Sequence, residues 1–377
     1  MKPKICFVAT IPAVVDSFLR SHIARLSQDF SVTVICNNQN TELLDGINAR
    51  FIFLPLMRKP SLWKDLVVLF KLIKLFYVER FFIVHSIMPK TGLLAMIAAL
   101  VARVPFRIHT FTGQIWVTKQ GFKRRFFKLI DRVIGAFCSI AIVDSASQKN
   151  FLISEGVLAA SKALVIGFGS ICGVDSERFK PDMAVRYNVR EELNIPSESC
   201  VILFIGRLNR DKGVLDLASA FLNIARLNKD FRLLLVGSEE DVTFDQIRAI
   251  CNGYQDRLLY VPYTKTPERY MMTADIFCLP SYREGFGMTI IEAAACGVPT
   301  VASRIYGITD AVDEGKTGLL FSAGNVKCLA ELLLNLLNSP ELRQRLGDAS
   351  RKRAIELFSL SEITSGLHKI YINLLDS

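Results

Sequence analysis

Residues 276–302 read IFCLPSYREGFGMTIIEAAACGVPTVA and contain, in order, a strand, a loop, a helix and a second strand. The apolar run Ile276–Leu279 stops at a proline, and apolar residues with helical spacing begin near Met288. The second apolar run, Thr300–Ala302, follows the helix. Because two strands joined through a helix form a crossover, the segment predicts two parallel strands of one sheet.

The same alternation of short apolar runs and helical patterns extends along the chain, with no internal repeat or low-complexity tract. It predicts an α/β protein built from parallel sheets. In the first half, strands are expected at Ile5–Ala9, Val32–Cys36, Phe51–Leu54, Phe82–His85, Arg107–Phe111, Ile140–Val143 and Ala163–Ile166. In the second half, strands are expected at Val201–Ile205, Arg232–Val236, Leu258–Val261, Ile276–Leu279, Thr300–Ala302 and Gly318–Phe321.

The length of the chain predicts two domains, because 377 residues exceed what one hydrophobic core normally supports. The polar stretch 176–199 contains two prolines and precedes an apolar strand, which favours a junction there, although a long surface loop would have the same composition. We expect doubly wound, Rossmann-like domains over residues 1–180 and 181–358. A last helix within residues 359–377 is expected to pack back on the first domain.

Composition excludes several classes of protein. Hydrophobic residues make up 51% and charged residues 22%, which is typical of a folded globular chain. The longest apolar runs, 92–102 and 133–143, are far shorter than the roughly 20 residues that cross a bilayer. Residues 1–17 resemble a secretory signal, but Pro12 interrupts the apolar stretch and no clean cleavage site follows. An opening strand and a loop at Pro12 are therefore favoured.

The cysteines and histidines predict neither a disulfide nor a metal site. The nine cysteines are scattered without C-x-x-C spacing, which favours free thiols in a reducing, cytoplasmic compartment. The four histidines are too dispersed for a metal cage. We expect no bound metal and no resident cofactor.

Charge is distributed unevenly along the chain, whose net charge is +10. Residues 1–180 hold 24 lysines and arginines against 11 aspartates and glutamates, a net charge of +13, and the remainder has a net charge of −3. A basic first half suits nucleic acid, an anionic membrane surface or phosphorylated substrates, and composition alone does not choose among them.

A basic loop follows the strand Val201–Ile205. Arg207 comes directly after Gly206, and Lys212 precedes a helix that begins near Val214. Backbone N–H groups, the positive end of a helix dipole and two cations together suit a diphosphate group. A solvated basic turn would have a similar sequence, so this loop alone is a weak signal.

A second candidate site combines two acids, Glu284 and Glu292, with a glycine-bearing turn between them. The two glycines let the backbone approach a ligand closely, and the following helix presents N–H groups to a negative group. Glu292 is placed to accept hydrogen bonds from vicinal hydroxyls such as those of a ribose. An exposed loop acid and a helix N-terminal acid without any ligand would give the same pattern.

Taken together, these motifs resemble glycosyltransferase family 4, which has the GT-B fold of two Rossmann-like domains facing across a cleft. The resemblance covers essentially residues 80–330. The motifs that carry it are Gly206-Arg207, Lys212-Gly213, Pro280-Ser281, Glu284 with Glu292, the segment ACGVPTV at 295–301, Gly173-Val174-Asp175, Arg178-Phe179, Pro181 and Gly315 to Gly318.

The resemblance implies a retaining glycosyltransferase whose second domain binds a nucleotide-sugar donor, expected to be a UDP-sugar. Arg207 and Lys212 would bind the diphosphate, Glu284 would lie near the donor sugar, and Glu292 would bind the ribose. The donor would also contact Gly285, Phe286, Gly287, Met288 and Thr289. No divalent ion is needed if the two cations stabilise the leaving group.

In the first domain, His109 follows the strand Arg107–Ile108 and resembles the cleft-facing catalytic histidine of the family. A lone histidine is otherwise more often a core residue with satisfied hydrogen bonds. The chain departs from many relatives at the first loop, where residues 10–14 (TIPAV) replace paired glycines. This leaves contacts of that loop with acceptor or phosphate in doubt.

Two helical patterns in the first domain predict an anionic membrane surface as a partner and a lipid-linked, polyprenyl-diphosphate acceptor. Residues 122–133 place Phe122, Phe126, Leu129, Ile130 and Val133 on one face and Arg124, Arg125, Lys128 and Arg132 on another. Residues 62–76 repeat large apolar residues with lysines alongside. The enzyme would then lie on the inner face of the cell membrane. Ordinary core-facing helices with solvated basic faces are the alternative.

Three other functions fit parts of the sequence. A GT-B sugar-nucleotide epimerase would alter the donor without an acceptor, and a soluble synthase would use a hydrophilic acceptor. A nucleic-acid-binding protein would use the basic first half but would not need the ordered donor motifs of the second, so we expect no nucleic-acid partner. The sequence does not predict an oligomeric state.

Overall fold

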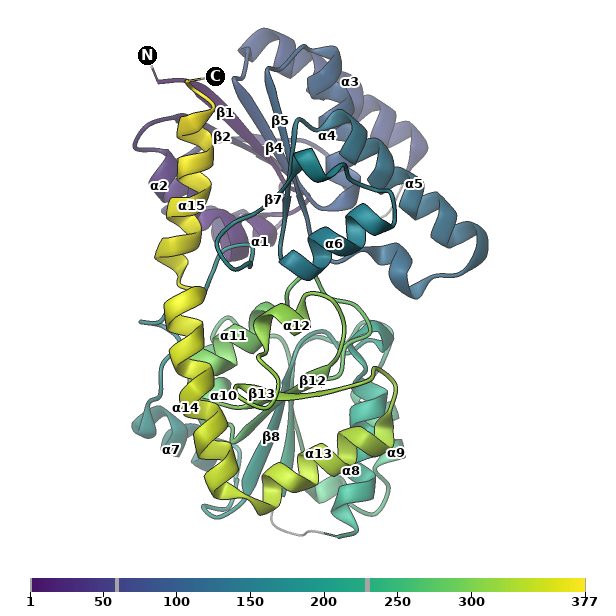
Figure 1. The fold of residues 1–377 in the computed structure, drawn as a ribbon, viewed down its shortest axis with the longest axis vertical. Coiled ribbons are helices and arrows are strands. Elements are labelled where there is room, and N and C mark those ends of the chain that lie inside the picture. The colour runs from purple at the N-terminus through teal and green to yellow at the C-terminus, as the bar shows by residue number, and fades with distance from the viewer. Residues whose placement is uncertain (1, 58–60, 228–230, 377) are drawn as a thin grey trace. The chain divides into compact units, whose positions relative to one another are not determined.

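The computed structural model describes residues 2–57, 61–227 and 231–376 and divides the chain into two compact units. The first unit comprises Met1–Gly173 and Leu360–Ser377, and the second comprises Val174–Ser359 (Figure 1). The polar stretch in which the sequence places a junction, 176–199, contains helix α7 (Met183–Glu192) and belongs to the second unit. The second unit is therefore inserted between two parts of the first.

The first unit is built on a sheet of seven parallel strands in the order β3-β2-β1-β4-β5-β6-β7. The strands are β1 (Lys4–Val8), β2 (Ser31–Cys36), β3 (Arg50–Phe53), β4 (Ile83–Ile87), β5 (Phe106–Phe111), β6 (Ile140–Val143) and β7 (Ala163–Val165). Each overlaps a predicted strand. The apolar runs that predict them are continuous because helices cover both faces of the sheet.

Helices α3, α4 and α5 lie side by side on one face of this sheet, and α2 and α15 pack together on the other (Figure 1). The helices of the unit are α1 (Pro12–Val14), α2 (Arg20–Leu26), α3 (Leu62–Glu79), α4 (Pro89–Val101), α5 (Gly121–Phe137), α6 (Ala146–Ser154) and α15 (Leu360–Asn373). The loop predicted at Pro12 is wrong, because α1 starts there and continues into a π-helical turn, Val15–Leu19. Proline fits a first helical position, where its missing N–H would have no helical acceptor.

The second unit has six parallel strands in the order β10-β9-β8-β11-β12-β13. They are β8 (Cys200–Ile205), β9 (Phe231–Val236), β10 (Leu258–Val261), β11 (Ile276–Leu279), β12 (Thr300–Ser303) and β13 (Gly318–Phe321), and each overlaps a predicted strand. The helices after α7 are α8 (Val214–Ala225), α9 (Phe244–Ile250), α10 (Pro267–Thr273), α11 (Met288–Ala295), α12 (Ile308–Ala311), α13 (Val326–Asn338) and α14 (Pro340–Leu357).

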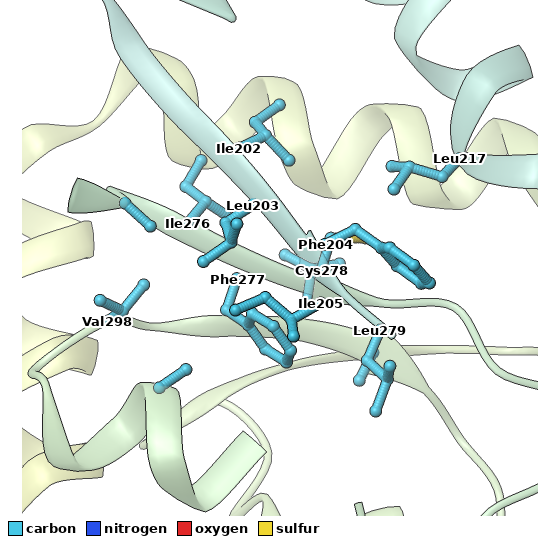
Figure 2. Close-up of a cluster of buried hydrophobic side chains, with 14 of the residues drawn as sticks. Ile202, Leu203, Phe204, Ile205, Leu217, Ile276, Phe277, Cys278, Leu279 and Val298 are labelled. Carbon is cyan, nitrogen blue, oxygen red and sulfur yellow. The ribbon is translucent and has the colours of Figure 1, made fainter. Parts of the chain in front are cut away.

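The centre of the second unit is the pair β8 and β11, which lie next to each other although seventy residues separate them in sequence. Their register pairs Ile276 with Ile202 and Phe277 with Leu203. Figure 2 shows the side chains of both strands gathered in the core with Leu217 of α8 and Val298. These side chains are buried, so the position of β8 against β11 is fixed by apolar packing.

The strand order also creates a switch point between β8 and β11. After β8, the chain crosses through α8 to β9 on one side, and after β11 it crosses through α11 to β12 on the other. The loops that leave the carboxyl ends of β8 and β11 therefore diverge. In open parallel sheets, ligands bind at such a point, outside the carboxyl ends of the strands.

Candidate functional site

The loop after β8 carries the two predicted phosphate-binding cations. The chain runs through Arg207 to a single 3-10 turn, Arg210–Lys212. Asn209 caps this turn, because its side-chain oxygen accepts the backbone N–H of Lys212 at 2.9 Å. Helix α8 begins directly afterwards at Val214, so the positive end of its dipole lies beside the loop.

Glu284 follows β11 and meets Lys212 at the switch point. The Oε1 atom of Glu284 lies 2.5 Å from Lys212 Nζ and also accepts the hydroxyl of Ser281 at 2.8 Å. Ser281 is fully buried, and both charged side chains are largely shielded from solvent. The carboxylate is therefore held by one donor from each of the two diverging loops.

Gly213 allows these two loops to touch. Its φ angle is +68°, and a Cβ atom at this position would lie 2.0 Å from the carbonyl oxygen of Pro280. Both the left-handed backbone and the contact exclude a side chain. The glycine before α8 is thus required by the packing of the loop after β8 on the loop after β11.

The segment 285–289 leads into helix α11, whose first helical residue is Met288. The N–H groups of Met288 and Thr289 belong to the first turn, where the helix itself offers no acceptor. Phe286 is different, because its ring is buried and packs edge-on against Phe358 with centroids 5.1 Å apart. Phe286 was predicted to contact the donor, but because its ring is buried, only its backbone can face a ligand.

Arg207 takes no part in the contact between Lys212 and Glu284. Its Nη1 atom lies 2.5 Å from Oε1 of Glu240, in the loop after β9, and Asn209 Nδ2 donates to the other oxygen, Oε2, at 2.6 Å. Arg207 and Glu240 are both 43% exposed. The structure therefore pairs this predicted cation with an acid that sequence reasoning did not single out.

Glu292 lies on α11, one turn after Met288, and is partly buried. Burial raises the pKa of its carboxyl group to about 7, with Glu268 nearby raising it further and Arg178 opposing the shift. Arg178 itself forms an ion pair with Glu268, with Nη2 and Oε2 2.8 Å apart. No contact in the described residues joins Glu292 to Glu284, so the two predicted acids occupy separate positions on the second unit.

His109 lies within β5 of the first unit, two residues before the strand ends, and is buried. Its Nδ1 atom is 2.8 Å from Ser86 Oγ, and its ring packs edge-on against Phe111. A Cβ atom on Gly92, in α4, would lie 2.3 Å from His109 Cε1, so the glycine makes room for the ring. Burial lowers the pKa of His109 to about 3, which keeps the imidazole neutral.

Sequence reasoning named Ser281 within the motif Pro280-Ser281, but it missed the other residues that hold the predicted ones in place: Asn209, Glu240, Ser86 and Gly92. Asn209 carries a recognisable signal, since it stands three residues before Lys212 where a turn begins. The others carry none, because their partners are distant in sequence and meet only through the strand order.

Comparisons with known proteins show the family of the chain. The family model of glycosyl transferases group 1 matches residues 185–353, and the model of the glycosyl transferase 4-like domain matches residues 19–169. The capsular polysaccharide biosynthesis glycosyltransferase CapM of Staphylococcus aureus is 31% identical over 372 residues, which cover 98% of this chain and 96% of that protein. The chain belongs to glycosyltransferase family 4.

The other similarities of this glycosyltransferase extend over most of its length. The UDP-Gal:alpha-D-GlcNAc-diphosphoundecaprenol alpha-1,3-galactosyltransferase of Escherichia coli is 27% identical over 360 residues, 92% of this chain and 90% of that protein. The crystal structure of Alr3699/HepE of Anabaena in complex with UDP has a TM-score of 0.81 at 20% identity and covers 99% of this chain and 100% of that one. The glycosyltransferase therefore has the GT-B fold of two Rossmann-like domains.

The glycosyltransferase exposes large apolar side chains on the helix layer of its first unit. On α3, one side is buried through Val68, Leu72 and Phe76, while the other exposes apolar residues next to lysines. The exposed apolar residues of α3 are Leu62, Trp63, Leu66, Val67, Phe70, Tyr77 and Val78. Among the described residues, no helix is long and apolar enough to cross a membrane.

Helix α5 differs from its predicted arrangement. Its aromatic face is exposed, with Phe122 stacked on Phe126. The basic face is largely engaged within the protein, because Arg124 and Lys128 pair with Glu155 and lie over the ring of Trp116. Arg132 donates to the backbone carbonyls of residues 155 and 156. The sequence did not indicate these contacts, because Glu155 and Gly156 directly follow α6 and lie more than twenty residues away from the basic residues that they bind.

Proposed function

We propose that this glycosyltransferase transfers a hexose or an N-acetylhexosamine from a UDP-sugar to a polyprenyl-diphosphate-linked acceptor, with retention of configuration, in surface polysaccharide synthesis. The observation that carries the proposal is the meeting of Lys212 and Glu284 at the switch point of the second sheet. A cation beside two helix N-termini suits the diphosphate, and the acid beside it suits the hydroxyls of the transferred sugar.

The donor chemistry follows from where charge develops. As the bond between sugar and diphosphate breaks, negative charge builds on the leaving oxygens, and fixed cations there stabilise the transition state more than the ground state. Lys212 and Arg207 would supply this stabilisation without a divalent ion. Glu292 would accept hydrogen bonds from the ribose, which the raised pKa permits once its carboxyl is ionised.

The acceptor would bind to the first unit. His109 would act as a neutral hydrogen-bonding group there, since its Nδ1 is bonded to Ser86 and no described residue bonds its Nε2. The lipid-linked class of acceptor is supported by the name of the galactosyltransferase relative, which acts on a sugar diphosphoundecaprenol. The name of the capsular polysaccharide relative supports the same biosynthetic setting.

The exposed face of α3 supports docking on an anionic membrane. Trp63 is 80% exposed and Phe70 is 68% exposed, with Lys64, Lys71 and Lys74 exposed on the same helix. Aromatic side chains enter the interfacial region, and each lysine near an anionic leaflet adds about 1 kcal/mol. Docking of this kind would bring the enzyme to the inner face of the cell membrane, where a lipid-linked acceptor is presented.

The donor proposal is tested by a thermal-shift panel of nucleotide sugars and free nucleotides. A ligand at 100 times its dissociation constant adds about 2.7 kcal/mol of stability. We expect UDP-sugars and UDP to stabilise the protein, and transfer to a polyprenyl-diphosphate-linked sugar to continue in the presence of EDTA. A changed sugar after incubation with donor alone would indicate the epimerase, and transfer only to water-soluble acceptors would contradict the lipid-linked acceptor.

Membrane docking is tested with liposomes that contain anionic lipids. We expect Trp63→Gln with Phe70→Gln to reduce binding at least tenfold, whereas Leu227→Gln, which changes an equally exposed apolar residue of the second unit, leaves binding unchanged. On α5, Arg125→Gln should reduce binding more than Arg124→Gln, because Arg124 is already paired with Glu155. Wild-type protein that ignores these liposomes at low salt would exclude this mode of docking.

A further inference from the structure

Glu240 lies beside the loop after β8 and contacts two side chains of that loop, Arg207 and Asn209. The loop after β9 runs beside the loop after β8, since Leu208 N–H donates to Ser238 O at 2.8 Å and Glu240 N–H donates to Leu208 O at 3.1 Å. The backbone of Glu240 is thus fixed against the loop that carries Arg207. Its carboxylate divides its two oxygens between Arg207 and Asn209, at 2.5 and 2.6 Å.

The same contacts connect the two predicted phosphate-binding cations. Glu240 orients the amide of Asn209, whose oxygen accepts the backbone N–H of Lys212. Asn209 is buried, so this amide has one orientation that satisfies both neighbours. A single carboxylate therefore sets the direction of the Arg207 side chain and supports the turn from which Lys212 reaches Glu284.

We propose that Glu240 is a positioning residue, which holds the guanidinium of Arg207 ready for the diphosphate of the nucleotide donor. The inference rests on the proposed function, because it assigns Arg207 to the donor phosphates. Glu240 accepts a hydrogen bond from Nη1 of Arg207, and a guanidinium has five N–H donors in a fixed plane. The remaining donors stay available to phosphate oxygens while the orientation of the plane is set.

The energetic advantage is preorganisation. A half-exposed arginine samples many rotamers, and ordering it on binding costs conformational entropy. Glu240 imposes this order before the ligand arrives. Its negative charge opposes the diphosphate only weakly, because Asn209 and Arg207 both donate to the carboxylate and water screens an exposed charge.

The test is a double-mutant cycle read by calorimetric binding of UDP and of uridine, with Glu240→Gln, Arg207→Ala and the double variant. We expect Glu240→Gln to weaken UDP binding about tenfold with Arg207 present and less than twofold with Arg207→Ala. Uridine binding should be unchanged, because uridine has no phosphate. Glu192→Gln is the control, since it breaks a comparably exposed ion pair with Arg269 in the same unit.

The outcomes separate this inference from the proposed function. Wild-type protein that binds no UDP, or Arg207→Ala protein that binds it normally, would overturn the assignment of Arg207 to the donor phosphates and Glu240 with it. Equal weakening by Glu240→Gln in both backgrounds, or equal weakening of uridine, would show a role in the loop fold alone. Tighter UDP binding by Glu240→Gln would show that the carboxylate competes with phosphate, which also overturns the inference.

Discussion

The two parallel sheets have similar strand orders, but the residues predicted to act at their carboxyl edges are charged in one sheet and neutral in the other. At the edge of the second sheet, ion pairs join Lys212 to Glu284 and Arg207 to Glu240. At the edge of the first sheet, the predicted catalytic residue is a buried, neutral His109 bonded to a serine hydroxyl. The basic residues of the first half are instead on helices such as α3. Net charge alone therefore does not indicate an anion site, whereas the pairing of charges at a switch point supports the proposed one.

The largest expected effect comes from the charged edge. Lys212→Ala should lower turnover roughly 10²- to 10³-fold, the scale for losing one fixed electrostatic donor. Lys352→Ala, which removes an exposed lysine of α14, should leave turnover unchanged. The measurement is the steady-state rate of sugar transfer at saturating donor. A wild-type rate for Lys212→Ala would remove the main difference between the two edges.

The close contact of the two loops at the charged edge predicts the next effect. Gly213→Ala should destabilise the second unit by about 3 kcal/mol, because it adds both left-handed strain and a clash with the Pro280 carbonyl. Gly253→Ala is the matched control, since Gly253 has a φ of +86° but no atom within 4 Å of the added Cβ. It should cost about 1 to 2 kcal/mol. The free energy of unfolding in urea measures the effect of both substitutions. Equal losses of stability would mean that the two loops can move apart at no energetic cost.

Glu292 of the second unit should make the binding of UDP depend on pH. The pKa of Glu292 is raised to about 7, so its carboxyl gains a proton as the pH falls through 7, and UDP affinity should decrease up to tenfold per unit below that. Glu292→Gln should bind UDP weakly at every pH. His109 adds no change above pH 5, because its pKa is lowered to about 3. Isothermal titration from pH 5.5 to 8.5 tests this, and a flat profile for the wild type would contradict the placement of Glu292 on the ribose.

The raised pKa of Glu292 also affects folding stability, and here the effect of pH is the reverse of its effect on UDP binding. The folded state binds the Glu292 proton more tightly than the unfolded state, whose ordinary pKa is 4.5. This group therefore favours the folded state at low pH, and that contribution is lost as the pH rises from about 4.5 to 7. Glu292→Gln should thus be relatively more stable than wild type at pH 8 than at pH 5, as measured by denaturant unfolding.

The smallest expected effect concerns a contact between two uncharged side chains in the first unit. Tyr371 of α15 and His85 of β4 share a buried hydrogen bond, with Oη and Nδ1 2.7 Å apart. Tyr371→Phe should cost about 1 to 2 kcal/mol, because it leaves a buried ring nitrogen unpaired. Tyr187→Phe, which removes an exposed hydroxyl bonded to Glu191, should cost less than 0.5 kcal/mol by comparison. Thermal unfolding compares them, and equal costs would show that this contact contributes nothing specific.

The sequence predicts the strands well because each parallel strand is a short apolar run buried on both faces. It predicts Lys212 and Glu284 because each lies in the loop that follows such a run, beyond the carboxyl end of a strand. The pairing of Arg207 with Glu240 was not predictable, since it depends on β9 lying beside β8. The burial of Phe286 and the ion pair of Arg124 were not predictable for the same reason. Their partners, Phe358 and Glu155, are brought close only by the fold.

The insertion of the second unit into the first has a consequence for biosynthesis on the ribosome. The first unit lacks α15 until the whole of Val174–Ser359 has been translated, and until then His85 has no Tyr371 to bond. Domains fold as units while the chain emerges, so the inserted unit can complete its core before the unit that precedes it. The two points where the chain passes between the units are tied together, since Val174 N–H donates to Phe358 O at 2.7 Å. Once the inserted unit has folded, the segment that begins at Leu360 therefore starts close to Gly173. This shortens the conformational search by which α15 packs onto the rest of the first unit.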